Sequence, residues 1–350
     1  MDGPLKNLLV VDLTRVLVGP YCTMILSDLG ARVIKVEAPE IGDDSRKFGP
    51  FVEDYSAYFM SLNRGKESIA LNLKNSDDKK IFDKILSKAD ILVENFKPGT
   101  LKKWGYDWKE VSKKFPKLIY ASASGFGQTG PLKELPAYDM VVQGMGGLMS
   151  VTGQPNSEPT RVGTSIGDIT AGLFTAIGIN AALYDRQKTG KGMYIDVSML
   201  DCQIAILENA IARYLSKNEI PKPMGSRHPS IAPFEAFKTK DSYIIIAAGN
   251  DKLFEKLCGI LEVPEMISDE KFNSNSSRAK NMDELKTIIE NKLSAKSTNE
   301  WVSQMEKDKI PGGRILKIKE GVEKRQVEAR NMIVRDYHKG MGEGKVGGRM

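Results

Sequence analysis

Asp168 is the residue whose surroundings point most directly to chemistry. It stands in the stretch GTSIGDITAGL (163–173), whose other residues are glycines, small hydroxyl residues and aliphatics. An acidic residue at the start of a helical pattern can cap that helix. A carboxylate in a glycine-lined pocket can instead act as a covalent nucleophile, and a helix amino terminus favours its ionised form. Both interpretations remain open from these residues alone.

The sequence has few residues that could form a metal site or a disulfide. The histidines are His228 and His338, and the cysteines Cys22, Cys202 and Cys258 are widely spaced with no CxxC pair. Zinc sites and disulfide frameworks both need such residues in closely spaced sets. We therefore expect no metal site, no disulfide and no prosthetic group.

The elements that must position Asp168 begin with a βαβ unit. NLLVVDL (7–13) and ARVIKVE (31–37) are apolar runs typical of strands, and Pro20 fits the first turn of a helix between them. Further strand candidates at 68–73, 91–96 and 118–125 alternate with helical stretches. This alternation predicts an α/β fold with a Rossmann-like, mostly parallel sheet covered on both faces.

The expected ligand site of such a sheet lies at the carboxyl ends of its strands. The first loop there, TRVLVGPY (14–21), is not the GxGxxG fingerprint that holds a dinucleotide pyrophosphate. GFGQTG (125–130) imitates that pattern but runs into Pro131. The sequence therefore argues against a nicotinamide-dependent dehydrogenase.

The second half of the chain predicts a separate, smaller domain. A long helix over 169–188, rich in small residues, is followed by a strand, and the segment 216–233 has four prolines that break all periodicity. Two strands about the turn KTKDS and helical patterns near 251–262 and 283–309 then indicate an α+β unit. We place a large domain at 1–200, a linker at 201–230, a small domain at 231–312 and a returning segment at 313–350 whose glycine-rich end we expect to be extended.

Composition excludes several classes of protein. The chain is 41% hydrophobic and 27% charged with a formal net charge of +6, and it has no interleaved basic and aromatic array. It shows no apolar run of the roughly 20 residues that span a bilayer, and its amino terminus lacks the pattern of a secretory signal. We expect a cytoplasmic protein that binds neither nucleic acid nor a membrane.

Several stretches together resemble the class III coenzyme A transferases. The resemblance covers roughly residues 5 to 335 and rests on DLTRVLVGPYCTMILSDLGARVIKVEAP, GDDSRKFGP, SLNRGKESIALNLK, ENFKPGTLKKWGYDW, LIYASASGFGQTGP, AYDMVVQGMGGLMSVTG, GTSIGDITAGL and GSRHPSIAPFEAFKTKDSYIIIAAGNDKLF. It implies a CoA transferase that acts on an acyl-CoA, such as succinyl-CoA, and a free carboxylic acid. The branch with succinate:hydroxymethylglutarate CoA transferase is the most similar, and Leu17, in place of a glutamine of formyl-CoA transferase, argues against oxalate.

The same resemblance implies roles for single residues. Asp168 matches the family's nucleophilic aspartate, which forms an aspartyl anhydride and then an aspartyl-CoA thioester. Lys74 matches a residue near the CoA phosphates. Asn95, Phe96 and Lys103 match residues near the nucleotide end. Each of these four also has an ordinary structural interpretation, as a solvated lysine or a core or loop residue.

The thioester end of CoA has its own implied residues. Tyr138 and Asp139 match the family's pair beside the thioester, or else form a turn at the sheet edge. Arg15 would pair with an acyl carboxylate, or else form a salt bridge there. Gly249 and Asn250 match a glycine loop that shields the intermediate, although a strand-to-helix turn explains them equally well.

Assembly and two rival functions complete the expectations. The resemblance implies a homodimer of interlocked rings, and family members run further than this chain, so we expect the returning segment to be incomplete. An α-methylacyl-CoA racemase would need a histidine where this chain has Tyr138. A non-catalytic CoA-binding subunit is the second rival.

Overall fold

The computed structural model describes residues 2–338 and 342–348, and the chain divides into two compact units. Unit 1 comprises residues 1–151, 159–221 and 326–350. Unit 2 comprises residues 152–158 and 222–325. Each unit is described by itself below.

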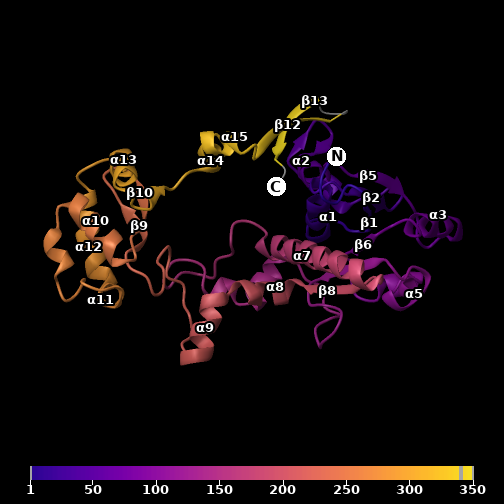
Figure 1. The fold of residues 1–350 in the computed structure, drawn as a ribbon, viewed down its shortest axis with the longest axis horizontal. Coiled ribbons are helices and arrows are strands. Elements are labelled where there is room, and N and C mark those ends of the chain that lie inside the picture. Colours follow the sequence, from indigo (N-terminus) through magenta and orange to yellow (C-terminus); the bar gives the residue numbers. More distant parts are fainter. Residues whose placement is uncertain (1, 339–341, 349–350) are drawn as a thin grey trace. The chain divides into compact units, whose positions relative to one another are not determined.

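Among the described residues, unit 1 is built on a six-stranded parallel sheet with the order β5-β2-β1-β6-β7-β8 (Figure 1). The strands are β1 (Leu9–Asp12), β2 (Arg32–Glu37), β5 (Glu67–Ala70), β6 (Ile91–Glu94), β7 (Ile119–Ser124) and β8 (Tyr194–Ser198). The predicted α/β fold class is confirmed. The strand order reverses between β1 and β6, and such a reversal opens a crevice beyond the carboxyl ends of the two strands.

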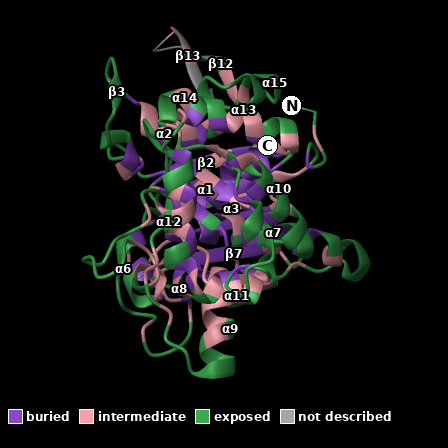
Figure 2. Ribbon diagram, turned by 90° about the vertical axis from the view of Figure 1, so that its left-hand side faces the viewer, coloured by how far each residue is buried: buried purple, intermediate pink, exposed green. Residues whose placement is uncertain are grey.

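Alternate strand residues pack on opposite faces of this sheet, as the period of two requires. On one face Val10, Ile91 and Ile119 pack with α1 (Val18–Asp28) and α7 (Ile166–Thr189). On the other face Val11 and Leu92 pack with α3 (Ser76–Leu86), α4 (Thr100–Trp104) and α5 (Trp108–Lys114). The central strands are therefore buried on both sides (Figure 2).

The long helix α7 packs in the core on one face of the sheet of unit 1. Its small residues allow the close approach expected from the sequence, since a Cβ on Gly172 would lie 2.8 Å from the carbonyl oxygen of Val18 in α1. Over 24 residues, α7 also has the length and composition of a membrane-spanning helix, which corrects the expectation that no segment comes near this. In the structure Ala171, Ala176 and Ile179 of this helix are buried within unit 1.

Two helices occupy much of the segment expected to be a linker. α8 (Met199–Ile206) and α9 (Glu208–Lys217) extend unit 1 to Pro221, so the irregular part begins only there. Ser198 starts α8 by accepting a hydrogen bond from the Asp201 amide, and Met199 and Cys202 are buried in the core. The expected boundary at residue 200 is therefore wrong, because packing continues past it.

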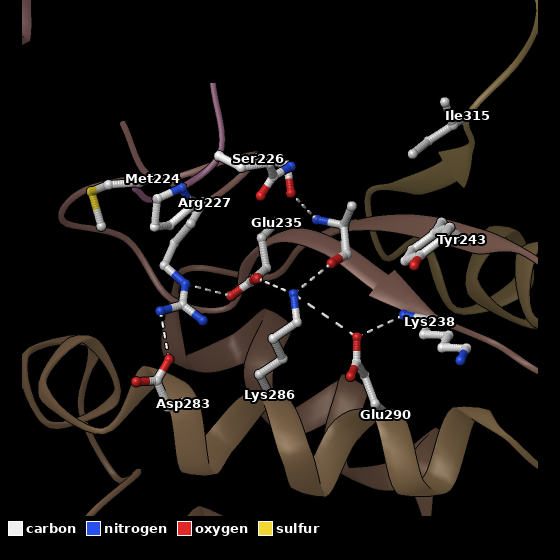
Figure 3. A pocket seen from close by; sticks show the side chains of 13 residues that line it. Met224, Ser226, Arg227, Glu235, Lys238, Tyr243, Asp283, Lys286, Glu290 and Ile315 are labelled. Carbon is white, nitrogen blue, oxygen red and sulfur yellow. Dashed lines mark hydrogen bonds and ion pairs between the residues drawn. The ribbon is translucent and has the colours of Figure 1, made fainter. Parts of the chain in front are cut away.

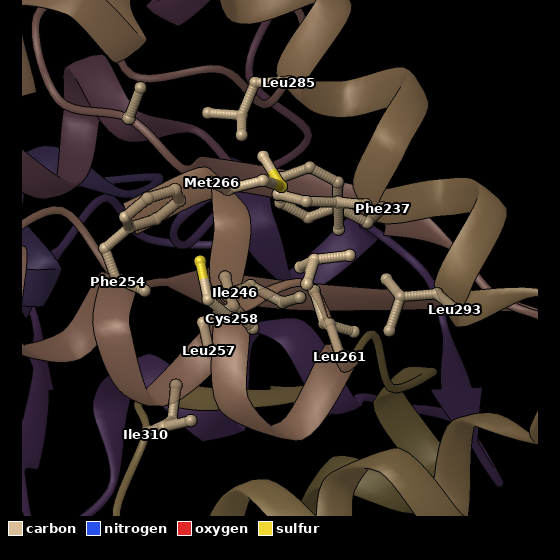
Figure 4. Close-up of a cluster of buried hydrophobic side chains, with 14 of the residues drawn as sticks. Phe237, Ile246, Phe254, Leu257, Cys258, Leu261, Met266, Leu285, Leu293 and Ile310 are labelled. Carbon is tan, nitrogen blue, oxygen red and sulfur yellow. The ribbon is translucent and has the colours of Figure 1, made fainter. Parts of the chain in front are cut away.

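Unit 2 consists of a small antiparallel sheet and the helices beside it. The elements are β9 (Phe234–Lys238), β10 (Tyr243–Ala247), α10 (Asp251–Leu261), α11 (Asn275–Lys280), α12 (Met282–Leu293), α13 (Thr298–Asp308) and β11 (Gly312–Arg314). Phe237, Ile246 and Leu257 lie at the centre of its core (Figure 4). The helical pattern expected over 283–309 is divided, because the Ser297–Glu300 capping box starts a new helix.

The last part of the chain has more structure than expected. α14 (Ile318–Val322) belongs to unit 2, which extends past residue 312. α15 (Arg325–Ala329) precedes an antiparallel pair formed by β12 (Ile333–His338) and β13 (Gly342–Gly347). The described part of the glycine-rich end is extended, as expected, and β13 pairs with β12.

Candidate functional site

The first turn of α7 carries Asp168, but Asp168 does not cap the helix. The residue at the N-cap position is Ser165, and its side chain makes no capping hydrogen bond. The amide of Gly167 donates instead to Oδ1 of Asp139, 2.8 Å away, at the start of α6 (Asp139–Met145). Within the described residues the Asp168 carboxyl has no hydrogen-bond partner. The capping interpretation is therefore wrong for Asp168, because Asp139 takes that role.

Asp139 is itself held firmly in place. Its Oδ2 accepts a hydrogen bond of 2.8 Å from the side-chain amide of Gln143, whose Oε1 accepts one of 2.9 Å from the amide of Val162. Asp139 is buried, whereas the neighbouring Tyr138 is 77% exposed. One oxygen of Asp139 thus fixes the start of α7, and Gln143 holds the other. Tyr138 is the member of the pair open to a ligand.

The environment of Asp168 favours its neutral form. Burial, together with the negative charge of Asp139, raises the pKa of Asp168 from 3.8 to about 7. Strongly raised pKa values of carboxyls in partly buried positions are common at functional sites. Near neutral pH this carboxyl therefore exchanges easily between a neutral form and a charged, nucleophilic form.

Tyr58 is a neighbour of Asp168 that sequence analysis missed. It lies in α2 (Ala57–Asn63), and its pKa is raised to about 12, first by burial and then by the charges of Asp168 and Asp43. Tyr58 thus lies within electrostatic reach of both carboxylates. No charge or glycine pattern marks this tyrosine in the sequence.

A cleft of about 550 Å³ lies at the carboxyl ends of β1, β2 and β5 in unit 1. It contains Arg15, Lys74 and Phe96, three of the residues that the resemblance implied for CoA. Its other lining residues are Leu13, Thr14, Val36, Glu37, Ala38, Pro39, Glu40, Ile41, Gly42, Asp43, Asp44, Leu71, Asn72, Leu73 and Trp104. Asp43 is among them, and its charge, like that of Asp168, contributes to the raised pKa of Tyr58. Asp168 itself is not among the lining residues.

Asn95 does not line the cleft, but it binds the backbone of Arg15, which does. Its side-chain oxygen accepts from the Arg15 amide at 2.9 Å, and its nitrogen donates to the Arg15 carbonyl at 2.8 Å. Asn95 follows β6 and Arg15 follows β1, so this pair of bonds joins the two loops at the point where the strand order reverses. The guanidinium of Arg15 lies 3.0 Å from Asp44 and 5.9 Å from the ring centre of Phe96.

Two lysines are placed differently around this cleft. Lys74 lines it, and the exposed Lys103 lies outside the lining, next to Trp104 in α4. Trp104 lines the cleft and packs edge-on against Phe96, with ring centres 5.3 Å apart. Among the described residues neither lysine has an ion-pair partner, so both are available to an anionic ligand.

Gly249 and Asn250 belong to unit 2, where local structure accounts for both. A Cβ on Gly249 would lie 1.9 Å from the side chain of Ile231, so close packing requires glycine there. The Asn250 side chain caps α10 by accepting from the Leu253 amide at 2.9 Å. These contacts match the expected alternative of a strand-to-helix turn.

Unit 2 has a larger cleft of about 800 Å³, but its charges pair with one another (Figure 3). Arg227 bridges Glu235 and Asp283, at 3.0 and 2.8 Å. Lys286 pairs with Glu235 and lies 3.9 Å from Glu290. These pairs tie β9 to α12. None of the residues implied by the resemblance lies in this cleft, so we assign the site to unit 1.

Comparison with known proteins gives one consistent family. Residues 5–349 match the family described as CoA-transferase family III. An acetyl-CoA:oxalate CoA-transferase of Acetobacter aceti is 48% identical over 95% of this chain and 86% of the relative. A succinyl-CoA:glutarate CoA-transferase of Mus musculus is 41% identical over 99% of this chain and 79% of the relative.

A solved structure agrees with these relatives. The crystal structure of a CAIB/BAIF family protein from Brucella suis superposes with a TM-score of 0.86 at 39% identity. The match covers 100% of this chain and 92% of that one.

Proposed function

Because this chain belongs to CoA-transferase family III, we propose that it transfers CoA between two short carboxylic acids through a covalent intermediate on Asp168. The coarse activity, CoA transfer from an acyl-CoA to a free acid, follows from the family and its named relatives. The intermediate, the residue roles and the identity of the acids are the proposal.

In the proposed reaction the ionised Asp168 attacks the thioester carbonyl of the donor. The C–S bond breaks, CoA leaves as a thiolate, and an acyl-aspartyl anhydride remains. The thiolate then attacks the aspartyl carbonyl, which releases the donor acid as a carboxylate and forms an aspartyl-CoA thioester. The acceptor carboxylate reverses these steps, so charge and atoms balance without any cofactor.

One observation carries this assignment above the others. Asp168 lies in the first turn of a helix yet leaves the capping to Asp139, and its own carboxyl has no hydrogen-bond partner among the described residues. A partly buried carboxyl without a structural bond costs stability. Such a cost is typical of a functional residue that the surrounding fold holds in position.

The cleft supplies the proposed CoA contacts. Lys74 offers an unpaired ammonium to the phosphates, and Phe96 with Trp104 offers an aromatic surface to the adenine. We propose that Lys103 meets a phosphate from the rim and that the exposed Tyr138 contacts the thioester end. Asn95 and Asp139 contribute by fixing Arg15 and the start of α7.

Dicarboxylic acids are the proposed substrates. The names of the relatives carry this proposal, and Arg15 does not. Its guanidinium lies in the cleft 5.9 Å from the ring centre of Phe96, at the end proposed for the adenine, so we propose that it meets a CoA phosphate instead of the acyl carboxylate. Its exposed pair with Asp44 is of the weak kind that such an anion can replace. The names of the relatives pair succinyl-CoA or acetyl-CoA with glutarate or oxalate. Because one relative is named for oxalate, we keep oxalate as a candidate substrate, although Leu17 argued against it.

A homodimer is the proposed assembly, with the interlocked topology implied by the family resemblance. Large apolar side chains of α7 and α6 are exposed in the single chain, among them Ile177 at 61% and Met140 at 59%. Together with the family resemblance, these exposed apolar side chains support an interface between two copies of the chain. Sedimentation velocity should give twice the mass of the chain, and a monomer at micromolar concentration contradicts this part of the proposal.

Mass spectrometry tests the covalent step. After incubation with succinyl-CoA, the peptide that contains Asp168 should carry a CoA adduct, and Asp168→Asn should carry none while it still binds CoA. An adduct elsewhere, or exchange activity in Asp168→Asn, refutes the nucleophile.

An acid panel tests the substrate class. Oxalate, succinate and glutarate should exceed butyrate as acceptors, and Arg15→Gln should raise the KM for acyl-CoA without reducing that preference. Arg32→Gln, which breaks an exposed ion pair with Glu67 at the amino end of β2, is the matched control. Equal rates with butyrate and the dicarboxylates would refute the substrate class, and a preference lost in Arg15→Gln would refute the placement of Arg15 at a CoA phosphate.

A further inference from the structure

The segment between β1 and α1 that presents Arg15 is held by buried side chains from other elements. We name residues 14–16 the β1 loop. The Nζ of Lys35, in β2, donates to the Thr14 carbonyl at 2.6 Å, and the Val16 amide donates to Oδ1 of Asp43 at 3.0 Å. With Asn95 on the Arg15 peptide, each residue of the loop has a backbone group bound by a side chain distant in sequence.

Lys35 and Asp43 also form an ion pair with each other. Their charged atoms are 2.8 Å apart, and each side chain is only 1% exposed. Burial alone would raise the pKa of Asp43, but the Lys35 ammonium and the hydrogen bonds from Ser45 hold it below its ordinary value. A buried pair gains little stability over apolar residues of the same size, because both charges lose their water. Its presence is better explained by what it holds in place.

The β1 loop needs to be held, because its backbone is strained. Val16 has a φ of 67°, in the left-handed region that β-branched residues avoid. Such residues persist only where the surroundings fix them, and they gather at functional sites. Glycine would adopt this conformation without strain.

We propose that Lys35 and Asp43 are positioning residues that hold the β1 loop so that Arg15 lines the cleft. This inference rests on the proposed function in one respect, that the cleft binds CoA. Neither residue needs to touch the reacting atoms. In the sequence Lys35 lies between the apolar residues Ile34 and Val36, a pattern whose purpose only the fold reveals.

Calorimetric binding of CoA to the full-length protein tests the proposal without depending on turnover. Lys35→Met with Asp43→Asn removes both charges together, so that neither is left buried alone. We expect the Kd for CoA and the KM for acyl-CoA to rise about tenfold, with kcat within about twofold. Lys35→Gln with Asp43→Asn, which also removes both charges but keeps polar groups able to bond to the β1 loop, is the second variant should the first double variant fail to fold, and we expect a smaller rise.

The matched control is the pair formed by Asp28 and Arg64, whose side chains are 4% and 14% exposed and which lies at the far end of α1. Asp28→Asn with Arg64→Met should leave the Kd unchanged. An equal loss in control and test variants overturns the proposal, as does unchanged CoA binding after removal of the Lys35–Asp43 pair.

Val16→Gly separates positioning from a general loss of structure. Added to the Lys35–Asp43 double variant, it should recover CoA affinity by about threefold, because glycine adopts the loop conformation without being held. In the wild-type background it should change the Kd little. No recovery overturns the positioning role. A missing adduct on Asp168 would refute the proposed nucleophile while leaving these binding results intact.

Discussion

Replacing Asp168 by asparagine is expected to stabilise the folded protein while it abolishes CoA exchange. Burial and the charge of Asp139 raise the pKa of Asp168 from 3.8 to about 7, so the folded state binds a proton that the unfolded chain has already released. Because the folded pKa lies above the unfolded one, the stability that this proton gives is complete below pH 3.8. It is lost as the pH rises through about 7.

The magnitude follows from the difference between the two pKa values. Each pH unit between them contributes about 1.4 kcal/mol. Relative to a neutral asparagine, the wild-type aspartate should therefore lower the free energy of unfolding by about 1.5 kcal/mol at pH 5 and by about 4 kcal/mol at pH 8. Asp168→Asn should recover these amounts, which are large against the net stability of a typical domain.

Urea unfolding of the wild type and Asp168→Asn at pH 5 and pH 8 measures this difference. Asp185→Asn, in the last turns of the same helix, controls for replacing a carboxyl in α7 by an amide. The stabilisation by Asp168→Asn must grow between the two pH values. A gain that is constant or falls with pH would show that Asp168 is not held in a desolvated position, and the account of its reactivity would fail with it.

Three further predictions concern the surroundings of the site. Asp139→Asn keeps an oxygen for the Gly167 amide but removes the charge beside Asp168. The acidic limb of the pH profile of kcat/KM should therefore move to lower pH. An unmoved limb would show that burial alone sets the pKa of Asp168. Lys74→Ala should raise the KM for acyl-CoA about tenfold and Lys103→Ala less, since only the first lines the cleft; the reverse order in steady-state kinetics would contradict this placement. Burial raises the pKa of all three cysteine thiols, so Ellman's reagent at pH 8 should label none in the native protein and three after denaturation. Rapid labelling of the native protein would show that a thiol is exposed.

The positions of secondary structure were predictable where one local signal dominated. The strands around Val10 and Ile91, and the helix after Ser165, follow from apolar periodicity and small-residue patterns. The linker boundary was not predictable, since prolines near 221 masked the buried residues that continue unit 1 through α8. The division of 283–309 into two helices depends on the capping box at Ser297, which apolar periodicity does not reveal.

The candidate site divides in the same way. The sequence by itself determined that Asp168 is a charge among glycines and small residues and that Arg15 and Asn95 follow separate strands, because residue type and spacing are local properties. Only the tertiary structure decided that Asp139 caps the helix of Asp168, that Asn95 binds the Arg15 peptide and that Lys35 binds the Thr14 carbonyl. These contacts join residues up to 80 positions apart. The parallel sheet creates them by bringing the ends of distant strands to one edge, and burial there gives each charge its chemical character.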